Sequence, residues 1–264
     1  MSERIKKIFE TKEKKLVTFT TGGDPDLNTS LEILKTIINN GIDIIEIGMP
    51  FSDPMADGPT IQESSVRSLA NGTKINDIFE IVTNIRKFNN EIPIILMGYY
   101  NSIFNLGIDN FTAKCAETGV DGLIIVDLQP EEDSELLTKT KEKGIDLIRL
   151  ITPTTDQKRL ITILSNASGF LYYVTVTGIT GQNSANIEDL KKSINTIKSS
   201  TKLPIVAGFG IKNKNDVEQI STFTDGVVVG SSIVNIIKDN LNDKNKMINE
   251  IKVFTKDLKE GIKE

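Results

Sequence analysis

Eight short apolar segments recur along the chain, and they limit what it can fold into. Each spans seven or eight residues, and most are rich in Val and Ile. They cover residues 16–22, 43–50, 93–99, 122–128, 146–152, 170–176, 204–210 and 226–232. Nearly continuous apolar runs of this length are typical of parallel strands that are buried on both faces. The sequence therefore predicts a parallel sheet of eight strands.

Amphipathic helical patterns fill the intervals between these segments. Leu31, Leu34 and Ile38, for example, recur at helical spacing ahead of Gly41. Eight strand–helix alternations predict an α/β fold, a single (β/α)₈ TIM barrel domain over residues 1–264. We expect extra helices at the N-terminus, after strand 2 and at the C-terminus. A doubly wound open sheet is the structural alternative, and the number of strands argues against it.

Composition excludes several chemistries. The 264 residues contain no histidine and one cysteine, Cys115, so imidazole catalysis, imidazole metal ligation and an internal disulfide are excluded. We interpret Cys115 as a core residue and expect no metal site. No lysine lies in the eight runs, which argues against a Schiff-base aldolase.

The net charge of −5 gives no general attraction to nucleic acid or anionic membranes. No apolar run could span a membrane and the N-terminus lacks a signal-peptide pattern, so we expect a cytoplasmic protein.

Active sites of such barrels lie at the carboxyl ends of the strands, and Glu46 is the first unusual residue there. It lies within the second run between Ile45 and Ile47. Burial at such a position raises a carboxyl pKa toward the range that suits proton transfer. The alternative is a structural carboxylate paired with backbone amides or with Arg149. The pattern alone leaves both interpretations open.

The loops after the strands supply further candidates. Asp53 and Asp57 lie in a Pro-rich loop after the second run, and either acid could be a simple turn former. Pro59 suits the first turn of a helix through 61–69. Glycines end runs seven and eight, in segments 208–210 and 230–232, where phosphate groups often bind backbone amides. Taken singly, each glycine could merely end a strand.

Residues 44–62, IIEIGMPFSDPMADGPTIQ, resemble the signature of the tryptophan synthase α chain family. Similar segments follow in the family's order, among them MGYYNSIFNLG, GVDGLIIVDL, YYVTVTGITG and PIVAGFGI. The family cleaves indole-3-glycerol phosphate to indole and glyceraldehyde 3-phosphate by a retro-aldol reaction. The resemblance implies that Glu46 is the proton-shuttling acid/base. It implies that Asp57 accepts a hydrogen bond from the indole N–H.

The resemblance also implies the remaining site residues. Those that match substrate-binding positions are Phe19, Met97, Tyr99, Ile124, Asp127, Tyr172 and Thr180. Those that match the phosphate site are Gly181, Phe209, Gly210, Gly230 and Ser231. Thr180 and Gly181 match a loop that closes over substrate in the family. Gln129 departs from the family pattern, because many members have proline there.

The family also implies a partner, a β chain that carries pyridoxal phosphate and receives indole through a tunnel in an α2β2 assembly. The expectation for this chain is therefore no cofactor of its own, substrate channelling, allosteric communication with β, and a role in tryptophan biosynthesis. Three alternatives stay open: a stand-alone indole-3-glycerol-phosphate lyase, a non-catalytic allosteric activator of β, and another phosphate-binding barrel such as a phosphosugar isomerase.

Overall fold

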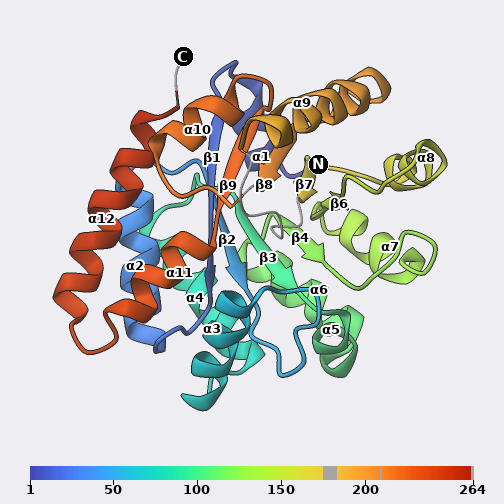
Figure 1. The fold of residues 1–264 in the computed structure, drawn as a ribbon. Helices are drawn as coiled ribbons and strands as arrows, with labels where there is room; N and C mark the ends of the chain where they lie inside the picture. The colour runs from blue at the N-terminus through green and yellow to red at the C-terminus, as the bar shows by residue number, and fades with distance from the viewer. Residues whose placement is uncertain (175–182, 209, 263–264) are drawn as a thin grey trace.

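A computed structural model describes residues 1–174, 183–208 and 210–262 of the chain (Figure 1). All pairings in its sheet are parallel, in the order β5-β4-β3-β2-β1-β9-β8-β7-β6. The strands are β1 (Lys15–Thr21), β2 (Ile44–Gly48), β3 (Ile94–Gly98), β4 (Gly122–Ile125), β5 (Asp146–Leu147), β6 (Arg149–Ile151), β7 (Leu171–Val174), β8 (Ile205–Gly208) and β9 (Gly226–Val229). The arrangement is a nearly closed barrel, so the TIM-barrel prediction is confirmed.

The fifth predicted strand is interrupted at Ile148, which divides it into β5 and β6. β5 pairs with β4, whereas β6 pairs with β7. The Ile148 N–H donates a hydrogen bond of 2.9 Å to the Leu123 carbonyl. β5 and β6 together therefore connect β4 to β7 across the sheet. Because both lie within the single predicted run 146–152, the nine strands correspond to the eight predicted runs.

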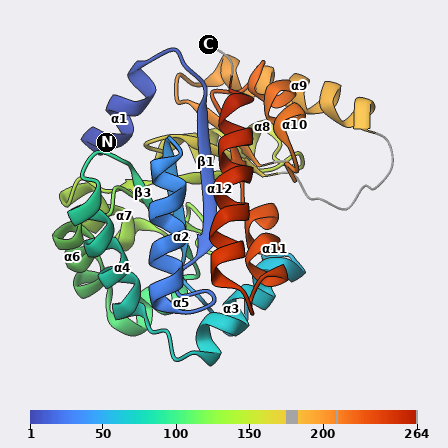
Figure 2. The ribbon, with the colours of Figure 1, turned by 90° about the vertical axis from the view of Figure 1, so that its left-hand side faces the viewer.

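Helices surround the sheet, and α2 and α12 lie side by side in both views (Figures 1 and 2). The helices are α1 (Glu3–Glu10), α2 (Leu27–Asn39), α3 (Pro59–Ala70), α4 (Ile75–Phe88), α5 (Tyr100–Leu106), α6 (Ile108–Thr118), α7 (Ser134–Glu142), α8 (Gln157–Ser165), α9 (Asn183–Ser200), α10 (Lys214–Ser221), α11 (Ser231–Asp239) and α12 (Lys244–Glu260). The extra helices α1, α3 and α12 lie where they were predicted, and Pro59 is the first residue of α3. Helix α5 was not predicted.

Apolar side chains form two separate cores. The larger core lies between the sheet and the helices, and Cys115 is fully buried in it, as predicted. The smaller core fills the barrel interior with side chains that include Val17, Ile44, Ile95 and Ile124. Helix α1 closes the amino-terminal end of the barrel with Ile5, Ile8 and Phe9, which pack against the interior core. The site must therefore open at the other end. In the described part of the chain, no helix has the length and apolarity needed to cross a membrane.

Lys15 lies one residue before the first predicted run, but in the structure it begins β1 and is buried, so this strand does contain a lysine. Its ammonium donates a hydrogen bond of 2.6 Å to Thr11 Oγ1. Lys15 extends the strand because it pairs with Gly226 of β9, a tertiary contact that the local apolar pattern does not reveal. It lies at the end of the barrel that α1 closes, away from the carboxyl ends of the strands.

Candidate active site

The carboxylate of Glu46 lies inside the barrel. Glu46 pairs with Phe19 of β1 and Ile95 of β3, and strand alternation places it on the same face as Ile44, which belongs to the interior core. The residue is fully buried, and neither carboxylate oxygen has a hydrogen-bond partner among the residues that the structure describes. Burial without compensation raises its pKa from 4.5 to about 8. Glu46 is therefore mostly protonated at neutral pH.

Arg149 does not neutralise Glu46, so that structural interpretation is wrong. Its guanidinium forms an ion pair with Asp133, the residue before α7, and both side chains are buried. Adjacent residues of a strand face opposite sides, so Arg149 points outward from the barrel while its neighbour Ile148 joins the interior core. Glu46 is left without a cationic partner in the described part of the chain.

Tyr172 shares the barrel interior with Glu46. Burial raises the pKa of the Tyr172 hydroxyl well above its usual value, and the nearby Glu46 carboxylate raises it further. The hydroxyl also lies close to the Gly208 backbone, since a Cβ added at Gly208 would come within 2.8 Å of Tyr172 Oη. Tyr172 is therefore a neutral phenol that lies near Glu46.

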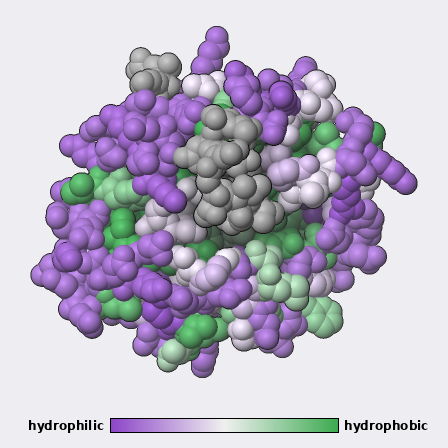
Figure 3. All heavy atoms as spheres, in the orientation of Figure 1, coloured by the Kyte–Doolittle hydropathy of each residue, from purple (hydrophilic) through white to green (hydrophobic). Residues whose placement is uncertain are grey.

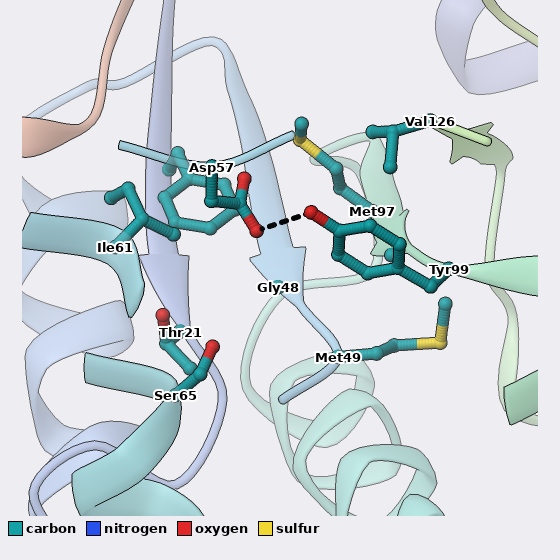
Figure 4. Close-up of a pocket in the computed structure, with 11 residues that line it drawn as sticks. Thr21, Gly48, Met49, Asp57, Ile61, Ser65, Met97, Tyr99 and Val126 are labelled. Atoms are coloured by element: carbon teal, nitrogen blue, oxygen red, sulfur yellow. Dashed lines mark hydrogen bonds between the residues drawn. The ribbon is translucent and has the colours of Figure 1, made fainter. Parts of the chain in front are cut away.

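Asp57 reaches the same end of the barrel from the loop between β2 and α3. The Tyr99 hydroxyl donates a hydrogen bond of 3.0 Å to Asp57 Oδ2 (Figure 4). The same hydroxyl accepts one of 2.9 Å from the Ala56 N–H. Phe51 stacks on the Tyr99 ring with a centroid distance of 5.0 Å. Burial raises the pKa of Asp57, an effect that the Tyr99 hydrogen bond opposes. The loop thus holds Asp57 against Tyr99.

A cavity lies at the carboxyl ends of β1 to β4, and both Asp57 and Tyr99 line it. Its lining residues are Phe19, Thr21, Gly48, Met49, Asp57, Ile61, Ser65, Met97, Gly98, Tyr99 and Val126. Four predicted site residues, Phe19, Asp57, Met97 and Tyr99, therefore lie together. Ile124 pairs with Met97 and belongs to the interior core, two residues before the cavity residue Val126. Glu46 is likewise two residues deeper than the cavity residue Gly48.

Sequence reasoning missed Thr21 and Ser65, whose side chains face each other in Figure 4. A signal existed for both. Thr21 lies two residues after Phe19 and shares its face of β1. Ser65 lies four residues after Ile61 on the predicted helix, so the two line the cavity from one helix face.

Asp127 lies at the rim, just after β4. Its Oδ1 accepts a hydrogen bond of 2.8 Å from the Tyr100 N–H in the first turn of α5. This contact ties the end of β4 to α5. Gln129 lies two residues later, and its Oε1 accepts a hydrogen bond from the Arg159 guanidinium of α8. The side chain of Gln129 thus joins the loop after β4 to α8.

Three of the expected phosphate residues, Gly210, Gly230 and Ser231, lie in the described loops after β8 and β9. Gly230 precedes that helix and Ser231 begins it. Gly210 has a φ of +58°, which favours glycine over other residues. The Ser232 hydroxyl donates a hydrogen bond of 2.7 Å to the Ile211 carbonyl, so the loops after β8 and β9 are in contact. Thr180, Gly181 and Phe209 lie outside the described residues. Among the described residues, no group of three or more Cys, Asp or Glu is placed to bind a metal.

Comparisons with known proteins agree with this geometry. The sequence matches the protein family described as Tryptophan synthase alpha chain over residues 5–263. A tryptophan synthase alpha chain from Petrotoga mobilis is 44% identical over 256 residues, which cover 97% of this chain and 98% of that protein. The crystal structure of tryptophan synthase subunit alpha from Legionella pneumophila str. Paris has a TM-score of 0.92 and 34% identity, and the match covers 99% of this chain and 98% of that chain. A structure from Aquifex aeolicus VF5 has a TM-score of 0.89 and 39% identity, with 100% and 98% covered. This chain therefore belongs to the tryptophan synthase alpha chain family, and it is a lyase of tryptophan biosynthesis that cleaves indole-3-glycerol phosphate.

Proposed function

We propose that Glu46 and Asp57 carry out the retro-aldol cleavage in this lyase. The observation that carries the proposal is the carboxyl group of Glu46, which is fully buried in the barrel interior with no partner among the described residues. A pKa of about 8 leaves this group able to give and to take a proton near neutral pH. Asp57 lines the cavity at the carboxyl end of β2, the strand that carries Glu46.

The reaction then proceeds in two proton transfers. Protonated Glu46 gives its proton to indole C3, which places positive charge on the ring nitrogen. Asp57 accepts a hydrogen bond from the ring N–H and stabilises that charge. The Glu46 carboxylate next takes the proton of the hydroxyl beside the bond that breaks. The electron pair of that C–C bond returns to the indole ring, a carbonyl forms on the glycerol phosphate side, and Glu46 is protonated again.

No cofactor is required in this scheme, because the protonated indole ring is the electron sink. We assign the apolar walls of the substrate site to Phe19, Met97, Ile124, Tyr99 and Tyr172. Asp127 contributes from the rim. For the phosphate we assign Gly210, Gly230 and Ser231 together with Gly181 and Phe209, and we assign Thr180 to the loop over the substrate. The dipole at the start of α11 favours a phosphate group at Gly230 and Ser231.

The partner in our proposal is a β chain with pyridoxal phosphate, in an α2β2 assembly that receives indole from this site. Two large apolar residues near the site support a docking surface: Met55, in the Asp57 loop, is 83% exposed and Phe104, on α5, is 68% exposed. The view in Figure 3 shows a mainly hydrophilic face with small, separate hydrophobic patches. A solved structure titled tryptophan synthase from M. tuberculosis, in an aminoacrylate-bound form, matches this chain at 26% identity and a TM-score of 0.88.

We place the enzyme in the cytoplasm, since a phosphate ester does not cross membranes unaided.

The experiment that tests these roles measures indole release by Asp57→Asn, with and without a β chain. We expect kcat to fall by about 10²-fold, since the amide cannot stabilise positive charge on the ring. Glu260→Gln is the control, because this exposed side chain pairs with Lys214 at the C-terminal end of α12. Equal rates for the two variants would contradict the role of Asp57. Rapid turnover without β would favour a stand-alone lyase, and activation of β without any turnover would favour a non-catalytic activator.

A further inference from the structure

Helix α3 is held in place by polar contacts to an unusual degree. It follows the Asp57 loop directly, and its buried residues are Ser64, Ser65 and Ser68. Val66 points into solvent. Most helices of this fold are fixed by a broad apolar stripe against the sheet. A face of serines buries little apolar surface, so hydrogen bonds and ion pairs determine where α3 lies.

These polar contacts join α3 to the end of β1 and the loop after it. Ser64 and Thr21 share a hydrogen bond of 2.5 Å between their hydroxyls. The Ser68 hydroxyl donates one of 2.7 Å to the Gly22 carbonyl. Each is a single bond that permits some rotation of the helix, so neither bond alone fixes its orientation.

Arg67 adds a contact with Asp24 that restricts the orientation of α3. Its Nε donates to Asp24 Oδ1 and its Nη2 donates to Asp24 Oδ2, both at 2.8 Å. The Asp24 side chain is fully buried and that of Arg67 is 18% exposed. Two parallel hydrogen bonds from a planar guanidinium fix both distance and orientation. The Arg67–Asp24 pair therefore sets the rotation of α3 about its own axis.

The position of α3 is transmitted to Asp57 over a short distance. The helix begins at Pro59, two residues after Asp57. The Gln62 side chain, in the first turn, donates a hydrogen bond of 2.9 Å to the Asp57 carbonyl. On the other side of the cavity, Tyr99 holds the Asp57 carboxylate. A rotation of α3 would thus move the Asp57 main chain while Tyr99 still held its side chain.

We propose that Arg67 is a positioning residue for Asp57. Its two hydrogen bonds to Asp24 fix the orientation of α3, and the orientation of α3 in turn fixes the position of Asp57. This inference rests on the proposed role of Asp57 in the reaction. The competing interpretation is that the pair only stabilises the fold. A matched pair exists at the opposite end of the barrel, where Arg86 Nη2 lies 2.5 Å from Asp121 Oδ2 and the two side chains are 9% and 2% exposed.

The test is a double-mutant cycle on the full chain with its β partner, in which kcat and KM are measured for Arg67→Gln, Asp57→Asn and the double variant. We expect Arg67→Gln to lower kcat by about 10- to 100-fold, since a misplacement of about 1 Å has an effect of that size. In the Asp57→Asn background the same change should lower kcat by no more than about twofold, since coupled residues are not additive. Arg86→Gln should lower the melting temperature and leave kcat unchanged.

Three results would overturn the inference. The first is an equal loss of kcat from Arg67→Gln in both backgrounds. The second is a loss from Arg86→Gln as large as that from Arg67→Gln. The third is an unchanged kcat for Asp57→Asn, which would instead identify the proposed role of Asp57 as the error. If Arg67→Gln does not fold, Ser68→Ala removes another polar contact of α3, the hydrogen bond to the Gly22 carbonyl. Its smaller loss of kcat should likewise vanish in the Asp57→Asn background.

Discussion

The buried carboxyl of Glu46 should reduce the stability of the protein at neutral pH, and Glu46→Gln should restore it. The pKa of Glu46 rises from 4.5 to about 8 on folding. A carboxyl with a raised pKa keeps its proton in the native state while the unfolded chain releases it. Its contribution to stability is therefore complete below pH 4.5 and is lost progressively as pH rises to about 8.

The magnitude follows from that shift. One pH unit corresponds to about 1.4 kcal/mol of free energy of unfolding. The interval from the unfolded-state pKa of 4.5 to pH 7 therefore corresponds to about 3 kcal/mol. Glutamine is neutral at every pH and has nearly the same shape. The difference in free energy of unfolding between Glu46→Gln and the wild type should therefore grow by about 3 kcal/mol in favour of the variant between pH 4.5 and pH 7.

Urea unfolding followed by circular dichroism at several pH values measures this difference. Tryptophan fluorescence cannot serve, because the chain contains none. Glu260→Gln is a suitable control, since its exposed carboxyl should give no comparable pH dependence. A difference between Glu46→Gln and the wild type that stays constant from pH 4.5 to pH 7 would refute the reasoning.

Two further predictions concern activity. If protonated Glu46 starts the reaction, kcat/KM for indole release should fall about tenfold from pH 7 to pH 9, because the protonated fraction at a pKa of about 8 falls from 10/11 to 1/11. A flat profile over that range would contradict the assignment. Gly48→Ala should raise KM at least about tenfold, because the added Cβ would lie 2.6 Å from Phe19 Cζ and would force the ring into the cavity. An unchanged KM would show that Phe19 does not shape the substrate site.

The sequence was sufficient to predict the barrel, because each strand is encoded by a local apolar run. It also singled out Glu46, because an ionisable residue within such a run is unusual. Local patterns failed where a contact with a distant segment decides the structure. Lys15 extends β1 because β9 lies beside it. Helix α5 has seven residues, too few for a clear apolar stripe.

The polar partners within the site could not be predicted from the sequence, because they also depend on contacts between distant segments. Arg149 was a possible partner for Glu46, but the direction of its side chain depends on how β6 sits in the sheet. It binds Asp133 instead. The hydrogen bond between Tyr99 and Asp57 joins residues 42 positions apart, on different loops. Such pairs arise from the closure of the barrel, and no spacing along the chain reveals them.

The central claim is that Glu46 is the acid/base of the cleavage, and indole release by Glu46→Gln tests it most directly. The assay compares this variant with the wild type on indole-3-glycerol phosphate at pH 7, with and without a β chain. We expect kcat to fall by at least about 10²-fold in both conditions while the variant remains folded, since glutamine can neither give nor take the proton. A variant that retains nearly full activity would contradict the account.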